Sequence, residues 1–363
     1  GVLVKSSKRL AVWVLGCALT MPAPAAAFSH FIFSNGPPRG VTVDGVFRVF
    51  TIAGYTEPSN RLVSKTATGE WVVAPAIAGV ASLQVAPGVV AAGPSPFGGP
   101  PRLYAISEGV YGVTEARLYQ FIPTSGGGGT WQDVTGFSVA PNLANAPALA
   151  AAWDAVAQRV VVGVRAANGD VWTCMIEGST NYCQWENESS RGTARAADTS
   201  SPIAVNVPAI GNEVELYSIK PNGVLQRYRW NMDAWDDVGT PSSPRGTTPD
   251  FVSLSAATVG GMTRVVLAGW DHSSYGDTLQ LATNSGGTWL WTNLSGPGAP
   301  DISWNLNNIF WARDSLGDRI WAVSATNPEL WYCNFTGSAC SSWTRVNLPQ
   351  NGRPNYDELD ENM

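Results

Sequence analysis

Arg159-Val-Val-Val-Gly163, followed by Trp185, is one copy of a pattern that occurs six times in this chain. The other β-prone segments are Arg48-Val-Phe-Thr-Ile52, Arg102-Leu-Tyr-Ala-Ile106, Glu215-Leu-Tyr-Ser-Ile219, Arg264-Val-Val-Leu-Ala268 and Arg319-Ile-Trp-Ala-Val323. Their first residues are 54, 57, 56, 49 and 55 positions apart, and each segment is followed by a tryptophan: Trp71, Trp131, Trp185, Trp235, Trp291 and Trp343. A period near 50 residues with strands in every repeat predicts a β-propeller.

Four strands can be placed in each repeat from alternating apolar residues and turn residues. In the fourth repeat they cover 201–206, 214–219, 224–230 and 234–238, and residues 30–35 supply a first strand for the first repeat. The sequence therefore predicts an all-β protein, a six-bladed β-propeller of four-stranded antiparallel blades. The propeller spans 28–350, with blades at about 28–78, 79–140, 141–195, 196–245, 246–299 and 300–350.

Composition and charge fit this prediction. The chain has 38 glycines and 25 prolines, enough for many tight turns, and only 14% charged residues. Its net charge is −6, and Lys and Arg form no run beyond residue 9, so no nucleic-acid surface is expected. The last residues, 351–363, form an acidic tail that we expect to be disordered.

The first 27 residues have the pattern of a signal peptide. Basic residues precede the apolar run 10–15, and Ala25-Ala26-Ala27 provides a small-residue cleavage site. This predicts a secreted or extracellular protein. The alternative is a bacterial lipoprotein, because Val14-Leu15-Gly16-Cys17 resembles a loose lipobox that would attach a lipid to Cys17. No later stretch is apolar and long enough to span a bilayer.

The remaining four cysteines form two local pairs, Cys174 with Cys183 and Cys333 with Cys340. Each pair brackets the turn before a repeat tryptophan, so a disulfide would join the third strand of a blade to the fourth. An export signal favours disulfides. A zinc site is not expected, because the two histidines, His30 and His272, do not have ligand spacing with the cysteines.

The repeated tryptophan and arginine each have two interpretations. A large aromatic residue on an outer strand packs between blades, but its ring could also stack on the apolar face of a sugar. The arginine opens the second strand in five repeats and is Glu215 in the fourth. Its planar guanidinium suits vicinal hydroxyls or a carboxylate, or else an inter-blade ion pair.

The repeats resemble those of the fungal fucose-specific lectin family. The shared elements are the arginine on the second strand, Gly-Val-Leu in Asn222-Gly-Val-Leu-Gln-Arg-Tyr-Arg-Trp230, and Trp235-Asp-Asp-Val-Gly239 on the fourth. The resemblance covers about 28–350 and implies a six-bladed propeller that binds sugar between blades. The implied ligand-binding residues are Arg48, Arg102, Arg159, Arg264, Arg319, Trp185, Trp291 and Trp343.

The chain departs from that family at the third-strand glutamate of the sugar pocket. The matching positions hold Gln120, Thr173, Gln226, Gln280 and Tyr332, so an ionised acceptor of sugar hydroxyls is missing there. A weaker likeness links Ala282-Thr-Asn-Ser-Gly-Gly-Thr-Trp289 and Thr124-Ser-Gly-Gly-Gly-Gly-Thr-Trp131 to the Asp-box turns of sialidases, although both lack the aspartate.

Catalysis has few candidates. Asp154 and Asp314 occupy matching turns and Asp271 follows a tryptophan, but an aspartate in such a turn usually forms the turn itself. The sequence therefore predicts a secreted, multivalent carbohydrate-binding propeller with glycans or other small polar molecules as ligands, and it assigns no catalytic residue, metal or cofactor. The alternatives are a propeller enzyme that acts on glycans or a secreted metabolite, and a protein-interaction scaffold.

Overall fold

The structure is a computed structural model of the whole chain, and it places most of the repeat region in detail. It describes residues 32–33, 39–54, 60–66, 72–85, 87–92, 101–109, 115–136, 139–177, 182–189, 191, 201–208, 213–220, 222–241, 250–271, 276–295, 298–300, 309–314, 317–323 and 330–346. The predicted signal peptide, Cys17, Trp71 and the acidic tail lie outside the described residues.

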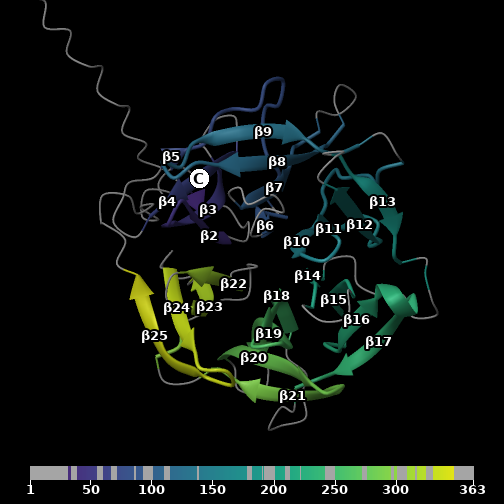
Figure 1. Ribbon diagram of the computed structural model, residues 1–363, viewed down its shortest axis with the longest axis vertical. Helices are drawn as coiled ribbons and strands as arrows, with labels where there is room; N and C mark the ends of the chain where they lie inside the picture. The colour runs from purple at the N-terminus through teal and green to yellow at the C-terminus, as the bar shows by residue number, and fades with distance from the viewer. Residues whose placement is uncertain are drawn as a thin grey trace, which may run out of the picture.

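The described strands form six sheets arranged in a ring, which confirms the six-bladed β-propeller (Figure 1). Blade 1 contains β2 (Arg39–Val43), β3 (Val46–Gly54), β4 (Arg61–Lys65) and β5 (Val72–Val73), and blade 2 contains β6 (Val90–Ala92), β7 (Arg102–Ile106), β8 (Leu118–Pro123) and β9 (Gly129–Asp133). Blade 3 contains β10 (Ala148–Asp154), β11 (Arg159–Arg165), β12 (Val171–Glu177) and β13 (Gln184–Asn187).

The other three blades repeat the same meander. Blade 4 contains β14 (Ile203–Asn206), β15 (Glu215–Ile219), β16 (Leu225–Arg229) and β17 (Ala234–Gly239), with a short 3₁₀ turn at Trp230–Met232. Blade 5 contains β18 (Asp250–Val259), β19 (Met262–Asp271), β20 (Gly276–Ser285) and β21 (Thr288–Asn293). Blade 6 contains β22 (Ile309–Asp314), β23 (Gly317–Val323), β24 (Leu330–Phe335) and β25 (Cys340–Val346). No helix among these described elements is long and apolar enough to cross a bilayer.

Two-residue turns set the register of several hairpins. Asp44 and Gly45, between β2 and β3, have φ values of 48° and 79°, and Gly260 and Gly261, between β18 and β19, have φ values of 60° and 76°. Positive φ at both central residues is the geometry of the tight hairpin turn whose twist matches that of the flanking strands. Glycine and aspartate at these positions therefore fix which strand residues face each other.

The ring closes between blades 1 and 6, where β2 lies beside β22. The first strand of blade 1 differs from the expected segment, 30–35. β1 (Ile32–Phe33) pairs only with the last two residues of β3, whereas β2 pairs with the first five residues of β3 and occupies the inner position. The hairpin turn at Asp44-Gly45 explains the difference, because it joins β2, not β1, directly to β3.

The core lies between blades. One apolar cluster joins Val161 of blade 3 to Val205 and Leu216 of blade 4. Gly163 permits this close approach, because a Cβ atom there would lie 2.8 Å from Cγ2 of Val205. Each blade is thus stabilised mainly by packing its faces against its two neighbours.

Both predicted disulfides are present. Cys174 of β12 is bonded to Cys183, which precedes β13, and Cys333 of β24 is bonded to Cys340 of β25. Each bridge joins the third strand of its blade to the outermost strand, as the cysteine spacing indicated.

Candidate functional site

Three repeat tryptophans connect neighbouring blades through their indole N–H groups. Nε1 of Trp131 donates to the carbonyl oxygen of Pro75 at 2.9 Å, Nε1 of Trp185 to that of Thr135 at 2.7 Å, and Nε1 of Trp235 to that of Glu188 at 3.2 Å. In every case the acceptor follows the outer strand of the preceding blade. Trp185, one of the predicted ligand-binding residues, is 9% exposed and forms part of the core.

Trp291 and Trp343 occupy the same strand position but are half-buried. Trp291 packs against the cluster between blades 4 and 5, and its Nε1 lies 4.0 Å from where a Cβ on Gly239 would stand. Trp343 packs against the cluster that contains Cys333, and its indole N–H has no hydrogen-bond partner among the described residues. These two rings are the more accessible of the three tryptophans that the sequence predicted as ligand contacts.

The arginines of blades 1 and 2 make different contacts. Arg48 is buried and reaches blade 2, where its Nε donates to the carbonyl oxygen of Ser125 at 2.7 Å. Burial lowers the pKa of Arg48 below its usual value. Arg102 stays within its own blade, half-buried, and donates to Oε1 of Gln120 at 2.9 Å.

The arginines of blades 3 and 5 lie over an aromatic ring of the next blade. Cζ of Arg159 is 5.2 Å from the ring centre of Trp230, and Cζ of Arg264 is 4.6 Å from that of Phe335. Both rings stand at or just after the end of a third strand, a position that sequence reasoning did not assign to the site. The repeat alignment could have found them, because the two aromatic residues are in register.

Arg159 and Arg264 differ in exposure. The side chain of Arg159 is 20% exposed; its Nε is 3.1 Å from Oδ2 of Asp154, and its Nη2 has no hydrogen-bond partner among the described residues. Arg264 is only 2% exposed, and burial lowers its pKa. Arg319 is also buried and lies over Tyr332 of its own blade at 4.2 Å. Arg159 is therefore more accessible than Arg264 and Arg319.

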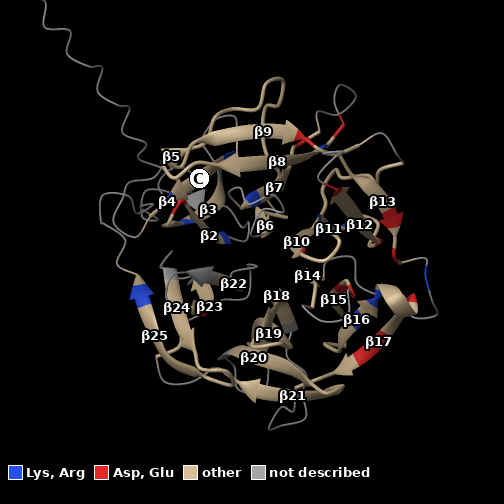
Figure 2. Cartoon of the chain, viewed as in Figure 1, with Lys and Arg blue, Asp and Glu red and all other residues tan. Residues whose placement is uncertain are grey.

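The groove between blades 3 and 4 also contains a buried carboxyl group. Glu188 follows β13, and its Oε1 accepts from Thr173 at 2.5 Å and from Nε1 of Trp230 at 3.2 Å. Burial raises the pKa of Glu188 above its usual value. The third-strand position in this blade holds Thr173, and Glu188, which follows β13, places a carboxyl group next to it. Figure 2 shows an acidic segment at the end of β13, and basic and acidic segments in β16 and β17 of the next blade.

In blade 4 the repeat arginine is replaced by a carboxylate that joins two blades. Glu215 is buried and accepts from Tyr217 at 2.7 Å and from Thr263 of blade 5 at 3.1 Å. In the same groove, Cζ of Arg227 lies 5.5 Å from the ring centre of Trp289. The groove between blades 4 and 5 is therefore filled by protein side chains at this position.

Asp154 has the contacts of a turn residue. Its Oδ1 accepts from the backbone N–H groups of Val156 and Ala157 at 3.1 and 3.0 Å, and its Oδ2 faces Arg159. These bonds stabilise the turn that leads into β11. The side chains of Asp271 and Asp314 lie outside the described residues.

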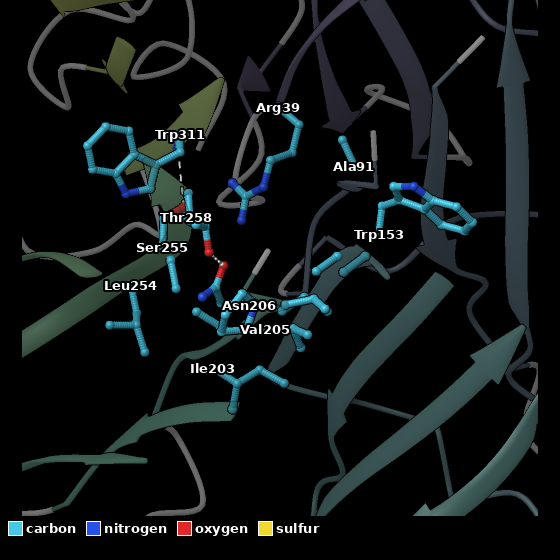
Figure 3. A pocket seen from close by; sticks show the side chains of 18 of the residues that line it. Arg39, Ala91, Trp153, Ile203, Val205, Asn206, Leu254, Ser255, Thr258 and Trp311 are labelled. Carbon is cyan, nitrogen blue, oxygen red and sulfur yellow. Dashed lines mark hydrogen bonds between the residues drawn. The ribbon is translucent and has the colours of Figure 1, made fainter. Parts of the chain in front are cut away.

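A separate cavity of about 590 Å³ lies on the axis of the ring. It is bordered by residues of all six inner strands, β2, β6, β10, β14, β18 and β22 (Figure 3). Sequence reasoning assigned no residue to this cavity. It contains small side chains, three polar side chains, Asn206, Ser255 and Thr258, and the cationic Arg39.

Comparison with known proteins yields similarity at the level of structure. No family model matches the chain, and no curated protein matches its sequence. Among solved structures, AofleA from Arthrobotrys oligospora is 14% identical, with 89% of each chain covered and a TM-score of 0.55. The lectin of Aleuria aurantia, described as a six-bladed β-propeller with a novel fucose recognition mode, is 12% identical, with coverage of 90% of this chain and 99% of the lectin and a TM-score of 0.56.

A third structure, the SapL1 lectin in complex with α-methyl fucoside, is 13% identical, with coverage of 88% of this chain and 97% of the lectin and a TM-score of 0.54. The chain shares the six-bladed propeller fold of these lectins. Because the sequence identities are this low, the similarity shows the fold alone. The ligand of this protein has to be inferred from its own residues.

Proposed function

We propose that this propeller is a secreted carbohydrate-binding protein, with sugar bound in grooves between adjacent blades. The observation that carries the proposal is the arrangement in the groove between blades 3 and 4. There the guanidinium of Arg159 lies across the ring of Trp230, fixed by Asp154, with Nη2 available. A planar cation with a spare donor and an aromatic ring are groups that suit the hydroxyls and the apolar face of a sugar.

The other predicted ligand-binding residues differ in accessibility from one groove to the next. Arg102, Trp291 and Trp343 are half-buried, and we propose them as contacts in further grooves. Arg48, Arg264, Arg319 and Trp185 are buried, so we propose that they mainly hold blades together. The two disulfides and the predicted signal peptide support secretion, since disulfides persist in oxidising compartments.

The proposal is tested with Arg159→Gln, the unmodified protein and a matched control. Arg117→Gln removes the same charge from an exposed side chain whose partner is Asp133, outside the groove. The probes are a glycan array and α-methyl fucoside, because the SapL1 lectin was solved with that sugar. We expect retention of at least one glycan class, weakened about 10-fold or more in Arg159→Gln and unchanged in Arg117→Gln, because a charge-assisted hydrogen bond contributes about 1.5 to 3 kcal/mol.

Three results would contradict the proposal. The first is an array with no retained glycan. The second is equal binding by Arg159→Gln and the unmodified protein, which would move the ligand away from this groove. The third is hydrolysis of aryl glycosides, which would make the protein an enzyme.

A further inference from the structure

Strand β21 is the outermost strand of blade 5, and no described strand pairs with its outer edge. The strand order of the sheet is β18-β19-β20-β21, so β21 is bonded to β20 on one side only. A free edge presents unpaired backbone N–H and C=O groups to any other strand. Natural sheets protect such edges with charged side chains, prolines, bulges or very short strands.

The other described outer strands have this protection. β9, β13, β17 and β25 contain Asp133, Glu186, Asp236 and Arg345, respectively, and β5 has only two residues. β21 contains neither a charged residue nor a proline, since its sequence is Thr-Trp-Leu-Trp-Thr-Asn. Figure 2 shows β21 without acidic or basic residues, whereas β17 and β25 contain them. Among the described outer strands, β21 is therefore the long edge that its own sequence leaves unprotected.

The register of β21 determines which backbone groups this edge presents. The turn Gly286-Gly287 joins β20 directly to β21, and its two φ values are positive, 61° and 91°. The residues that flank a two-residue hairpin turn form a hydrogen-bonded pair, and bonded pairs then alternate along the strands. Thr288 follows the turn directly, so it and Leu290 direct their backbone groups to β20. The backbone groups of Trp289 and Trp291 therefore point to the outer edge.

The side chains of β21 alternate between the two faces of the sheet. Trp289 and Trp291 pack against the apolar cluster between blades 4 and 5. Leu290 points to the opposite face and is 56% exposed. Covering this edge with a second strand would remove apolar surface of Leu290 from water, which favours association.

The sequence of this edge is symmetric about Leu290. Thr288-Trp289-Leu290-Trp291-Thr292 reads the same in both directions. When two copies of the strand meet antiparallel on a two-fold axis at Leu290, each Trp289 lies opposite Trp291 of the second copy. These tryptophans form hydrogen-bonded pairs, because their backbone groups are the ones that point outward.

The same register suits the remaining side chains. Leu290 lies opposite its own copy in a non-hydrogen-bonded pair, where Cα atoms are about 4.5 Å apart and side chains are closest. Thr288 lies opposite Thr292, and threonine pairs across strands are favourable. No charged side chain is brought opposite one of the same sign, which would destabilise the pair.

We propose that the protein forms a homodimer in which the β21 strands of two copies pair antiparallel about Leu290. The two four-stranded blades then form one continuous sheet. The partner is a second copy, because the two-fold register uses the outward backbone groups, the exposed leucine and the absence of charge together. The dimer carries the grooves of two rings, and linked sites gain avidity. Arg159 lies on blade 3, so sugar binding and dimer formation can fail separately.

Sedimentation velocity of the full chain over a concentration series tests the association. A pair of edge strands is a small interface, so we expect a reversible equilibrium between monomer and dimer. Leu290→Lys puts two like charges on the two-fold axis and should abolish the dimer, and the fold should tolerate it because Leu290 is exposed. The matched control is Met232→Lys, since Met232 is 54% exposed and lies on blade 4; it should associate like the unmodified protein.

Two results of this experiment would overturn the proposal. One is an unmodified chain that stays monomeric up to about 1 mM, which would leave the edge to a strand of another protein. The other is a dimer that Leu290→Lys and Met232→Lys affect equally, which would place the interface elsewhere.

Further variants test the register. A mixture of Leu290→Lys and Leu290→Glu should restore the dimer, since opposite charges then face each other across the axis. Leu290→Cys should become a covalent dimer when diamide oxidises the two facing thiols to a disulfide, because Cα atoms about 4.5 Å apart lie within disulfide range. Met232→Cys is the control and should not cross-link. A mixture that stays monomeric, or equal cross-linking of both cysteine variants, would refute pairing about Leu290.

Discussion

The repeat tryptophan has two structural roles in the propeller. Its indole fills the space between two blades, and in blades 2, 3 and 4 its N–H also ties the blade to a carbonyl of the preceding one. A phenylalanine could fill the space between the blades, but it could not donate this hydrogen bond. The residue type is therefore explained by structure at Trp185, while the half-buried Trp291 and Trp343 keep part of their rings accessible.

This difference can be measured with a matched pair of substitutions. Trp185→Phe removes a bonded indole N–H and leaves the carbonyl of Thr135 without its donor, whereas Trp343→Phe removes an N–H that has no described partner. We expect Trp185→Phe to lower the free energy of unfolding by about 1 kcal/mol more than Trp343→Phe does. Denaturant unfolding of both variants measures this, and an equal loss would show that only ring volume matters.

Glu188 gives the stability of the protein a pH dependence. Its pKa is raised by burial from the ordinary value of 4.5, so the folded state holds this proton more tightly than the unfolded state does. Stability should therefore fall as pH rises from about 4.5 through the folded pKa. Glu188→Gln lacks this titration, so its unfolding free energy relative to the unmodified protein should increase over that window. A difference that is constant with pH would contradict the assignment.

At the scale of the element, each blade is a meander of consecutive strands, and in blades 1 and 3 the outer strand is paired over only a few residues. β13 pairs with β12 over four residues and β5 with β4 over two. The disulfides lie at this outer side in blades 3 and 6. They hold the outermost strand where backbone pairing with one neighbour is its main attachment.

Removing either disulfide should lower stability by a similar amount. The bridges close loops with sequence separations of 9 and 7, for which loop-closure entropy gives about 2 to 3 kcal/mol each. We expect Cys174→Ala with Cys183→Ala, and separately Cys333→Ala with Cys340→Ala, to lower the unfolding free energy by about this amount. The unmodified protein under reducing conditions is the control, and it should lose about the sum.

The repeats in the sequence predicted the six blades, with the first strand of blade 1 as an exception, but they did not predict the grooves. Second-strand arginines and fourth-strand tryptophans recur at matching positions of the repeats, so their places in the blades could be read from the sequence. Which arginine is accessible depends on the next blade: Trp230 and Phe335 cover Arg159 and Arg264 to different extents. Apart from the seam between blades 1 and 6, the hydrogen bonds between neighbouring blades described above join residues 42 to 77 positions apart, so no single repeat contains the information.

At the scale of the whole molecule, the ring depends on one seam between blades 1 and 6. There the ring of Phe47 stacks on that of Trp321, with centres 4.6 Å apart and planes inclined by 20°. Phe310, the cross-strand partner of Trp321 in blade 6, has its ring centre 6.2 Å from that of Trp321. Among the described strands, no strand of one end of the ring is inserted into the sheet of the other, so side chains hold this seam.

The seam can be tested by a double-mutant cycle. Phe47→Leu and Trp321→Leu, alone and together, should show a coupling energy of about 0.5 to 1.5 kcal/mol in the free energy of unfolding, as expected for stacked aromatic rings. Tyr217 with Trp289, between blades 4 and 5, is a reference pair at 6.1 Å in edge geometry. A coupling energy near zero for Phe47 and Trp321 would mean that the rings do not hold the seam.

Blades made of consecutive strands also have a consequence for the history and engineering of the chain. Every blade is made of consecutive strands, so a gene for this ring could be opened at any connection between blades and rejoined across the present seam without splitting a sheet. Circular permutants opened between blades 3 and 4 would keep all six sheets intact. By the same logic, a ring of this kind can grow by duplication of one module, with each new copy diverging in its groove while the neighbouring copies preserve the fold.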